Sequence, residues 1–322
     1  MFKVSDPSEA RGNSITAREI LDNGSKEIDT GLAKDPETQA QLMGVMGNVY
    51  IGLGLYPRAQ PLLERTLDIR RRVHGPRNPE TLQSADDLAW LLFQEGHYAE
   101  AEKLGRETLE IRRQVLGQEH PDTLTSMRHL ASALWKEGRY AEAEKMQREL
   151  LDTDRRVLGP EHRDTLATMN NLAATLKEEG HYTEAEKMQR ELLDIKRRVL
   201  GPERPETLMT IDNLAATLQD EGRYAEAERM QREVLDIQRR VLGPEHPETA
   251  TSIYNLGCLA AVQGRRDEAF SLLRQAVDHG FPPWADLSIE KDPDIQSLHG
   301  DPRFAALVAD AKERAAAAQK PH

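Results

Sequence analysis

The side chains of this chain that could do chemistry recur at fixed positions, and one recurring set is a glutamate–histidine pair that could hold a metal. The pairs are Glu119-His120, Glu161-His162 and Glu245-His246. In another copy of the same stretch the histidine is replaced by Arg204. Each pair lies among glycines and prolines, which is typical of a turn between helices. We therefore predict that these are turn and helix-cap residues, and we expect no metal site.

Sequence motifs of known catalytic chemistry are missing. The chain has no GxSxG, HExxH, Walker loop or CxxC. Its one cysteine, Cys258, excludes an internal disulfide and a cysteine-based zinc site, and we expect it to be a small buried or half-buried residue. We predict no catalytic residues and no cofactor, and hence a protein that is not an enzyme.

A second recurring set is polar and stands immediately before a recurring leucine. Its members are Asp87, His129, Asn171, Asn213 and Asn255. Neighbouring positions on the same side are Arg128, Asn170, Asp212 and Tyr254. Asparagine offers both a donor and an acceptor without a charge. These side chains could bind a partner, or they could bond an adjacent helix and fix the packing of the repeats.

These residues are positioned by a repeat of 42 residues. Six glycines mark its period: Gly54, Gly96, Gly138, Gly180, Gly222 and Gly264. The blocks that follow from the second glycine on read GHYAEAE, GRYAEAE, GHYTEAE, GRYAEAE and GRRDEAF. A fixed period of this length predicts an array in which each unit buries its apolar face against its neighbours.

Each repeat reads as two helices. In the third unit, apolar residues spaced three and four apart follow Pro121 and end before Gly138, which predicts a first helix. A second helix is expected from about Ala141 to Leu158. Leu130, Leu172 and Leu214 are predicted to lie inside the stack. The first helix of the first full unit is expected to be weaker than the others, because it contains Gly44, Gly47 and Gly52.

The composition limits the partners and the compartment. A net charge of −12 argues against nucleic acid and anionic membranes, because both need a clustered basic surface. No run of about 18 apolar residues is present, so no membrane span is predicted. The first residues lack the apolar core of a signal peptide, and we expect a cytoplasmic protein.

The pattern apolar-x-x-Leu-Ala-x-x-Leu-x-x-x-Gly-x-Tyr-x-x-Ala resembles the tetratricopeptide repeat. The 42-residue period, the NLA before the glycine and the GPEHP turn resemble the kinesin light chain subclass over residues 36–279. The resemblance implies that first helices line a concave groove. It also implies that the second Asn of Asn-Asn-Leu-Ala, matched by Asn171, Asn213 and Asn255, hydrogen-bonds the backbone of a bound extended peptide. Asp87 and His129 depart from that pattern.

The predicted fold is an all-α, right-handed solenoid of six helix-turn-helix repeats with helical caps. Residues 1–35 are expected to form an N-terminal capping helix, with Ile15, Ile20, Leu21, Ile28 and Leu32 on its apolar face. Residues 36–280 form the repeats. Residues 281–322 are expected to cover the open end of the stack. The covering residues would be Phe281, Trp284, Leu287, Leu298, Phe304 and Leu307.

Two functions are compatible with this sequence. The first is a scaffold that binds a protein or peptide segment in the concave groove. The alternative is a regulatory or sensor module of a bacterial serine/threonine kinase system, because both flanks resemble segments beside tetratricopeptide arrays in such kinases. The chain itself has no glycine-rich kinase loop, His-Arg-Asp or Asp-Phe-Gly. Oligomeric state is not indicated by the sequence.

Overall fold

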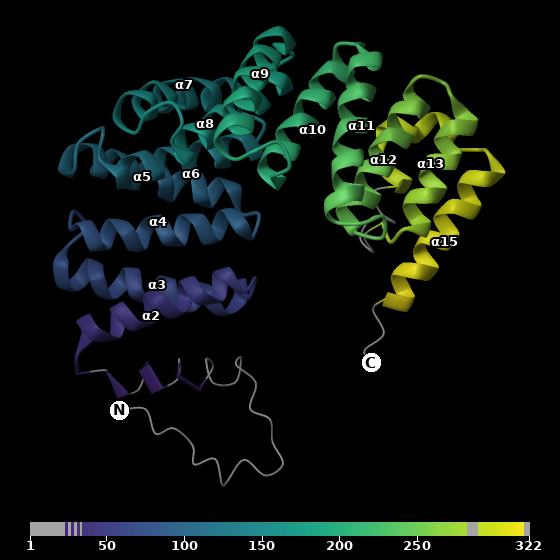
Figure 1. Ribbon diagram of the computed structural model, residues 1–322. Helices are drawn as coiled ribbons and strands as arrows, with labels where there is room; N and C mark the ends of the chain where they lie inside the picture. Colours follow the sequence, from purple (N-terminus) through teal and green to yellow (C-terminus); the bar gives the residue numbers. More distant parts are fainter. Residues whose placement is uncertain (1–22, 25–26, 29–30, 33, 282–288, 319–322) are drawn as a thin grey trace. The chain divides into compact units, whose positions relative to one another are not determined.

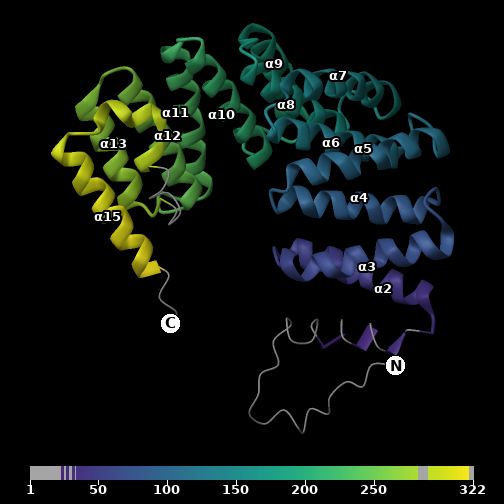
Figure 2. The same cartoon turned by 180° about the vertical axis from the view of Figure 1, so that it is seen from behind.

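The chain forms two compact units, residues 1–157 and residues 158–322. The computed structural model describes residues 23–24, 27–28, 31–32, 34–281 and 289–318. These residues are 81% helical and contain no strand. The helices are shown from two opposite sides in Figures 1 and 2.

The first unit is built from three helix pairs. Its helices are α2 (Pro36–Gly52), α3 (Tyr56–His74), α4 (Pro79–Gln94), α5 (Tyr98–Val115), α6 (Pro121–Lys136) and α7 (Tyr140–Val157). Each helix packs on the next along the chain, and α4 also contacts α2 and α6. Figure 1 shows α3 and α4 side by side. The first helices of successive repeats therefore lie next to one another.

The second unit repeats this plan and adds a C-terminal segment. Its helices are α8 (Arg163–Glu178), α9 (Tyr182–Val199), α10 (Pro205–Asp220), α11 (Tyr224–Val241), α12 (Pro247–Val262), α13 (Arg266–Asp278), the 3-10 helix η1 (Pro293–Leu298) and α15 (Pro302–Ala318). Here η1 packs on α12, and α15 packs on α13. The C-terminal segment thus occupies the place that a further helix pair would take.

The predicted turn chemistry sets the helix boundaries. The backbone N–H of Asp122 donates to Nδ1 of His120 (3.2 Å), and His162 and His246 cap α8 and α12 in the same way. A side chain that accepts a first-turn N–H satisfies a donor that the helix leaves unpaired. The cap interpretation of the glutamate–histidine pairs is therefore confirmed for these histidines. At the other end of α6, Gly138 takes a φ of +74°, which favours glycine.

The interior follows the predicted leucines and small residues. Leu130, Leu172 and Leu214 are 2%, 1% and 0% exposed. Small residues let the two helices of a pair approach closely, and glycine, which has no Cβ, allows the closest approach. A Cβ on Gly47 would lie 2.6 Å from Cδ2 of Leu63. Gly47 thus serves close packing, and α2 runs unbroken through Gly44 and Gly47 and ends at Gly52.

The two ends of the described chain carry apolar residues that continue the core. Ile28 is buried and Leu32 partly buried against the first unit, while Ile15, Ile20 and Leu21 lie outside the described residues. In the second unit, Leu298, Phe304 and Leu307 join the core of α12 and α13, and Phe281 packs against it. Trp284 and Leu287 lie outside the described residues.

Candidate partner-binding face

The polar column lies along the first helices of the repeats. We use the name first-helix face for the surface of these helices within each unit: α4 and α6 in the first unit and, separately, α8, α10 and α12 in the second. The five column residues, Asp87, His129, Asn171, Asn213 and Asn255, are all half-buried. Each lies beside a buried leucine, so its side chain is held at the edge of the core.

In the first unit the column residues are tied to their neighbours. The carboxylate of Asp87 accepts hydrogen bonds from Nε2 of Gln83 (2.8 Å) and Nδ2 of Asn48 (3.2 Å). Burial, together with the charge of Asp86, raises the pKa of Asp87. The His129 ring stacks on Trp90, with ring centroids 4.6 Å apart. The departures from asparagine therefore build a local network in this unit.

A buried ion pair lies directly under that network. Nη1 of Arg112 is 3.4 Å from Oδ2 of Asp86, and both side chains are almost fully buried. Asp86 Oδ2 is also 3.2 Å from Nδ1 of His129, and Asp86 Oδ1 accepts from Oγ of Ser126 at 2.8 Å. Burial by itself would raise the pKa of Asp86, but His129, Arg112 and Ser126 outweigh it and hold that pKa below its usual value. One repeat along, Arg128 faces Asp154 at 3.4 Å, so the charges are exchanged.

In the second unit the asparagines divide into two kinds. Nδ2 of Asn213 donates to Oδ1 of Asn170 at 3.2 Å, which joins α10 to α8. The side-chain amides of Asn171 and Asn255 have no hydrogen bond to any residue in the described part of the chain, and neither is fully buried. Asn213 thus takes the packing role, while Asn171 and Asn255 keep donors and acceptors for solvent or a ligand.

Asp212 stands between these asparagines on the same face. Its carboxylate is half-buried and makes no hydrogen bond or ion pair to another described residue. The position corresponds to Asp86, but the place of Arg112 is taken by Gln238, which carries no charge. Burial first, and then the charge of Glu248, raise the pKa of Asp212 to about 7. A cationic group brought to this carboxylate would relieve that penalty.

The side chain of Tyr254 is not free to bind a partner, because it contacts the C-terminal part of the chain. It is 5% exposed, its ring stacks on Phe281 with centroids 4.3 Å apart, and its hydroxyl donates to Oδ2 of Asp292 at 2.8 Å. Cys258 is buried, 3.7 Å from the same carboxylate oxygen. Burial, with Asp292 nearby, raises the pKa of the Cys258 thiol. These contacts hold the C-terminal segment on α12.

The second helices carry a different kind of surface. A cleft of about 880 Å³ lies between α9 and α11 and is lined by charged residues such as Arg190, Asp194, Arg197, Glu233 and Asp236. Several of these charges are already paired, as in the 2.6 Å contact of Arg197 with Glu233. Residues of this cleft therefore provide control positions for mutations on the first-helix face.

Sequence reasoning missed the residues beneath the column. The residue types alone give no reason to single out Asp86 and Arg112, because charged residues are seldom fully buried. A signal was present in the spacing: Asp86 with Arg112 and Arg128 with Asp154 are oppositely charged pairs 26 residues apart. The acid and the base exchange places between the two repeats, which is expected where two repeat positions are in contact and either one can carry either charge.

The comparisons with known proteins identify the family and the fold of the chain. The tetratricopeptide repeat family model matches residues 38–114, 94–155, 122–198, 164–230 and 205–279, so the chain belongs to the tetratricopeptide repeat family. The all-α, helix-turn-helix repeat fold is thereby confirmed. None of the curated proteins compared matches the chain.

Solved structures add the kinesin light chain likeness. A putative kinesin light chain from Podosopora anserina with nearly identical repeats is 26% identical, with a TM-score of 0.58 over 63% of this chain and 95% of that one. BtubC (BKLC) from P. vanneervenii is 21% identical, with a TM-score of 0.57 over 70% and 90%. The apo form of RapI is 12% identical, with a TM-score of 0.66 over 87% and 97%. The last two structures are less than 25% identical to this chain, so their similarity shows the fold alone.

No helix among the described residues combines the length and the apolar character that crossing a membrane requires.

Proposed function

We propose that this protein is a non-enzymatic scaffold that binds an extended segment of a partner protein on its first-helix face. The observation that carries the proposal is the pair of half-buried amides, Asn171 and Asn255, which make no hydrogen bond within the described chain. An amide at this depth is positioned by the core beneath it and can pair with a peptide group. Membership of a family of protein-binding repeats supports the same conclusion.

The charge on this face narrows the partner's chemistry. Asp212 lies beside the column, on the helix between those of the two free amides, and has no cation beside it among the described residues. A segment that offers backbone groups to the asparagines and a lysine or arginine to Asp212 would satisfy both. Tyr254 is left out of the proposed contact set, because its hydroxyl already bonds Asp292.

The test begins with a ligand selected from a displayed library of random peptides, followed by titration calorimetry. Replacing Asn171 and Asn255 together by alanine should weaken the selected peptide about 5- to 150-fold, since two hydrogen bonds of about 0.5–1.5 kcal/mol each are lost. The melting temperature should stay the same. Asn213→Ala should instead lower stability, because it breaks the bond to Asn170.

The matched control lies on the second helices. Asp194→Ala with Asp236→Ala alters two exposed residues of the α9–α11 cleft and should leave peptide affinity unchanged. If the control weakens binding while the asparagine variant does not, the cleft is the binding surface and the proposal is wrong.

The kinase-linked alternative is tested with the same protein. A pull-down against the products of flanking genes would recover a kinase domain if the chain is a sensor module. Recovery of a kinase through residues other than the first-helix face would favour that role over the scaffold.

A further inference from the structure

One position in the turn between repeats departs from the repeat pattern in a chemically distinctive way. The last residue before the turn glycine is leucine in four units: Leu116, Leu158, Leu200 and Leu242. In the first unit it is His74. An imidazole in place of an aliphatic side chain gains a metal ligand and gives up apolar packing. The residues around His74 show whether its imidazole is placed to bind a metal ion.

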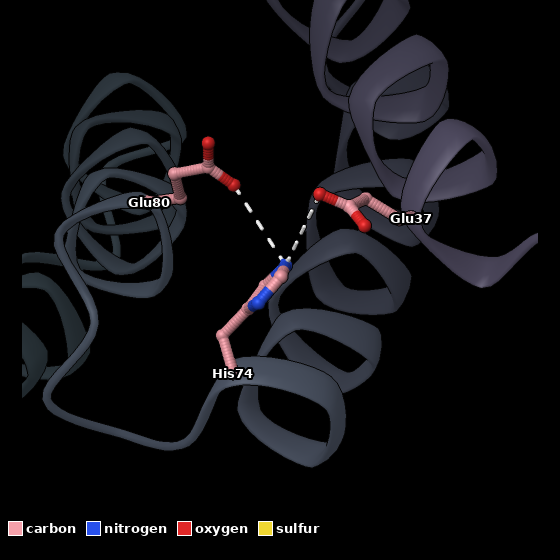
Figure 3. Close-up of side chains that lie close together, drawn as sticks. All are labelled: Glu37, His74 and Glu80. Atoms are coloured by element: carbon pink, nitrogen blue, oxygen red, sulfur yellow. Dashed lines mark ion pairs between the residues drawn. The ribbon is translucent and has the colours of Figure 1, made fainter.

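Two carboxylates face His74 from two different helices. Nε2 of His74 is 3.8 Å from Oε1 of Glu37 and 3.9 Å from Oε2 of Glu80. Figure 3 shows both carboxylates turned toward the imidazole, with Glu37 from α2 and Glu80 from α4. One ligand atom from each of the three residues lies within 4.8 Å of the others. The three side chains line a cavity of about 110 Å³, which is large enough for an ion and its water.

The ends of the helices bring these groups together. His74 is the last residue of α3, while Glu37 and Glu80 lie in the first turns of α2 and α4. The two glutamates hold equivalent positions in successive repeats, so the repeat itself supplies the two carboxylates. The imidazole is 22% exposed, whereas Glu37 and Glu80 are 67% and 60% exposed. The histidine is therefore held in place, and the carboxylates can move to meet an ion.

The donor set matches a first-row divalent cation. One imidazole nitrogen and two carboxylate oxygens leave at least one position for water, and tetrahedral Zn²⁺ keeps such donors roughly 3.4 Å apart. The two distances from Nε2 of His74 to the glutamate oxygens, 3.8 and 3.9 Å, need to close by only about half an ångström to reach this spacing. Arg70 lines the same cavity, but its Nη1 donates to the backbone carbonyl of Glu80 (3.0 Å) and to Oγ of Ser84 (2.9 Å). The positive charge of Arg70 lowers the affinity of the site for a cation, but the guanidinium does not occupy the position of the ion.

We propose that Glu37, His74 and Glu80 form a Zn²⁺-binding site that clips α2, α3 and α4 together. This site is independent of the first-helix face and of any partner bound there. Its structural effect would fall on the first repeat, because α2 carries three glycines, which lower its intrinsic helix propensity. Because the ion binds only the folded site, zinc should raise the melting temperature of the protein.

The test uses the full chain without an affinity tag, freed of metal by chelation, and titrated with Zn²⁺ by calorimetry and with Co²⁺ by visible absorption. We expect one strong site per chain and a ligand-field spectrum of a low-symmetry site. His74→Leu restores the residue of the other repeats, so it should fold, and it should weaken Zn²⁺ binding by at least tenfold. Glu37→Gln and Glu80→Gln should each weaken it as well.

The control removes a different imidazole. His97 is exposed and makes no side-chain cap hydrogen bond, so His97→Ala should leave zinc affinity and the zinc-dependent rise in melting temperature unchanged. Wild-type affinity in His74→Leu would overturn the proposal, as would an equal loss in His97→Ala. A wild-type chain that shows no strong site in calorimetry would also overturn it.

Discussion

At the scale of single residues, neighbours in sequence have opposite electrostatic surroundings. Asp86 is fully buried beside Arg112 and His129, and its pKa is lowered; Asp87 receives only neutral donors, and its pKa is raised. Asp212 repeats the position of Asp86 without the arginine, and its pKa rises to about 7. The partners that the surrounding helices supply, His129 and Arg112 for Asp86 and neither of them for Asp212, therefore decide whether the same carboxylate stabilises the fold.

The Asp212 carboxylate should make stability depend on pH. Its folded pKa lies above its unfolded value of about 3.8, so folding favours the protonated form. That stability is present below pH 4 and is lost as pH rises toward about 7. Asp212→Asn should therefore raise the free energy of unfolding at pH 8, by about 2–4 kcal/mol after allowance for partial exposure.

Denaturant unfolding of wild type and Asp212→Asn at pH 4 and pH 8 measures this difference. The gain should nearly vanish at pH 4. An equal gain at both values would show that the carboxylate does not titrate in this range.

At the scale of helices, buried polar residues join a second helix to the first helix that follows it, as between α5 and α6 and between α9 and α10. Nη1 of Arg112 donates to the backbone carbonyl of Asp122, and Nζ of Lys196 donates to that of Glu206. Each donor also reaches a hydroxyl four residues further on, Ser126 and Thr210 respectively. A long cation bonded this way fixes the register between helices, because a shift would leave it buried and unsatisfied.

Removing the partner of Arg112 should therefore destabilise the first unit. Asp86→Asn leaves the buried guanidinium without its countercharge and should cost about 3 kcal/mol or more. The adjacent change Asp87→Asn removes a carboxylate whose pKa is already raised, and it should cost less than about 1 kcal/mol. Urea melts of both variants give the comparison; equal costs would mean that the Asp86–Arg112 pair carries no special weight.

At the scale of the whole molecule, stability comes from contacts between neighbouring repeats. Such arrays have no single central core, and an uncovered terminal unit exposes apolar surface. In the second unit that surface is covered by Ile295, Leu298 and Phe304, all packed into the core of α12 and α13. We therefore propose that residues 281–322 act as a cap, as the sequence predicts.

Deleting residues 281–322 should make the protein aggregate, because it exposes the apolar end of α12 and α13 and removes the partner of Tyr254. Light scattering at increasing protein concentration, with a thermal melt, measures the effect. As a control, Arg314→Ala in the same segment removes an exposed ion pair with Asp278 at the end of α13 and should leave both readouts nearly unchanged. A truncated protein that stays monomeric with an unchanged melt would contradict the cap.

The sequence by itself determined the repeat and the boundaries of its helices, because these depend on local rules. Glycine ends a helix, proline and a capping side chain begin the next, and leucines spaced three and four apart define the buried face. Those rules also placed the polar column on the first helices. They operate within about ten residues, so a single chain is enough to read them.

The partners of the column residues were decided only by tertiary structure. Asn213 bonds Asn170 while Asn171 and Asn255 bond nothing in the described chain, although all match one motif. Tyr254 bonds Asp292, and His74 meets Glu37, across separations of 38 and 37 residues. Such contacts depend on how neighbouring repeats pack and on which residue each repeat offers. Periodicity therefore gives the position of a side chain but not its partner.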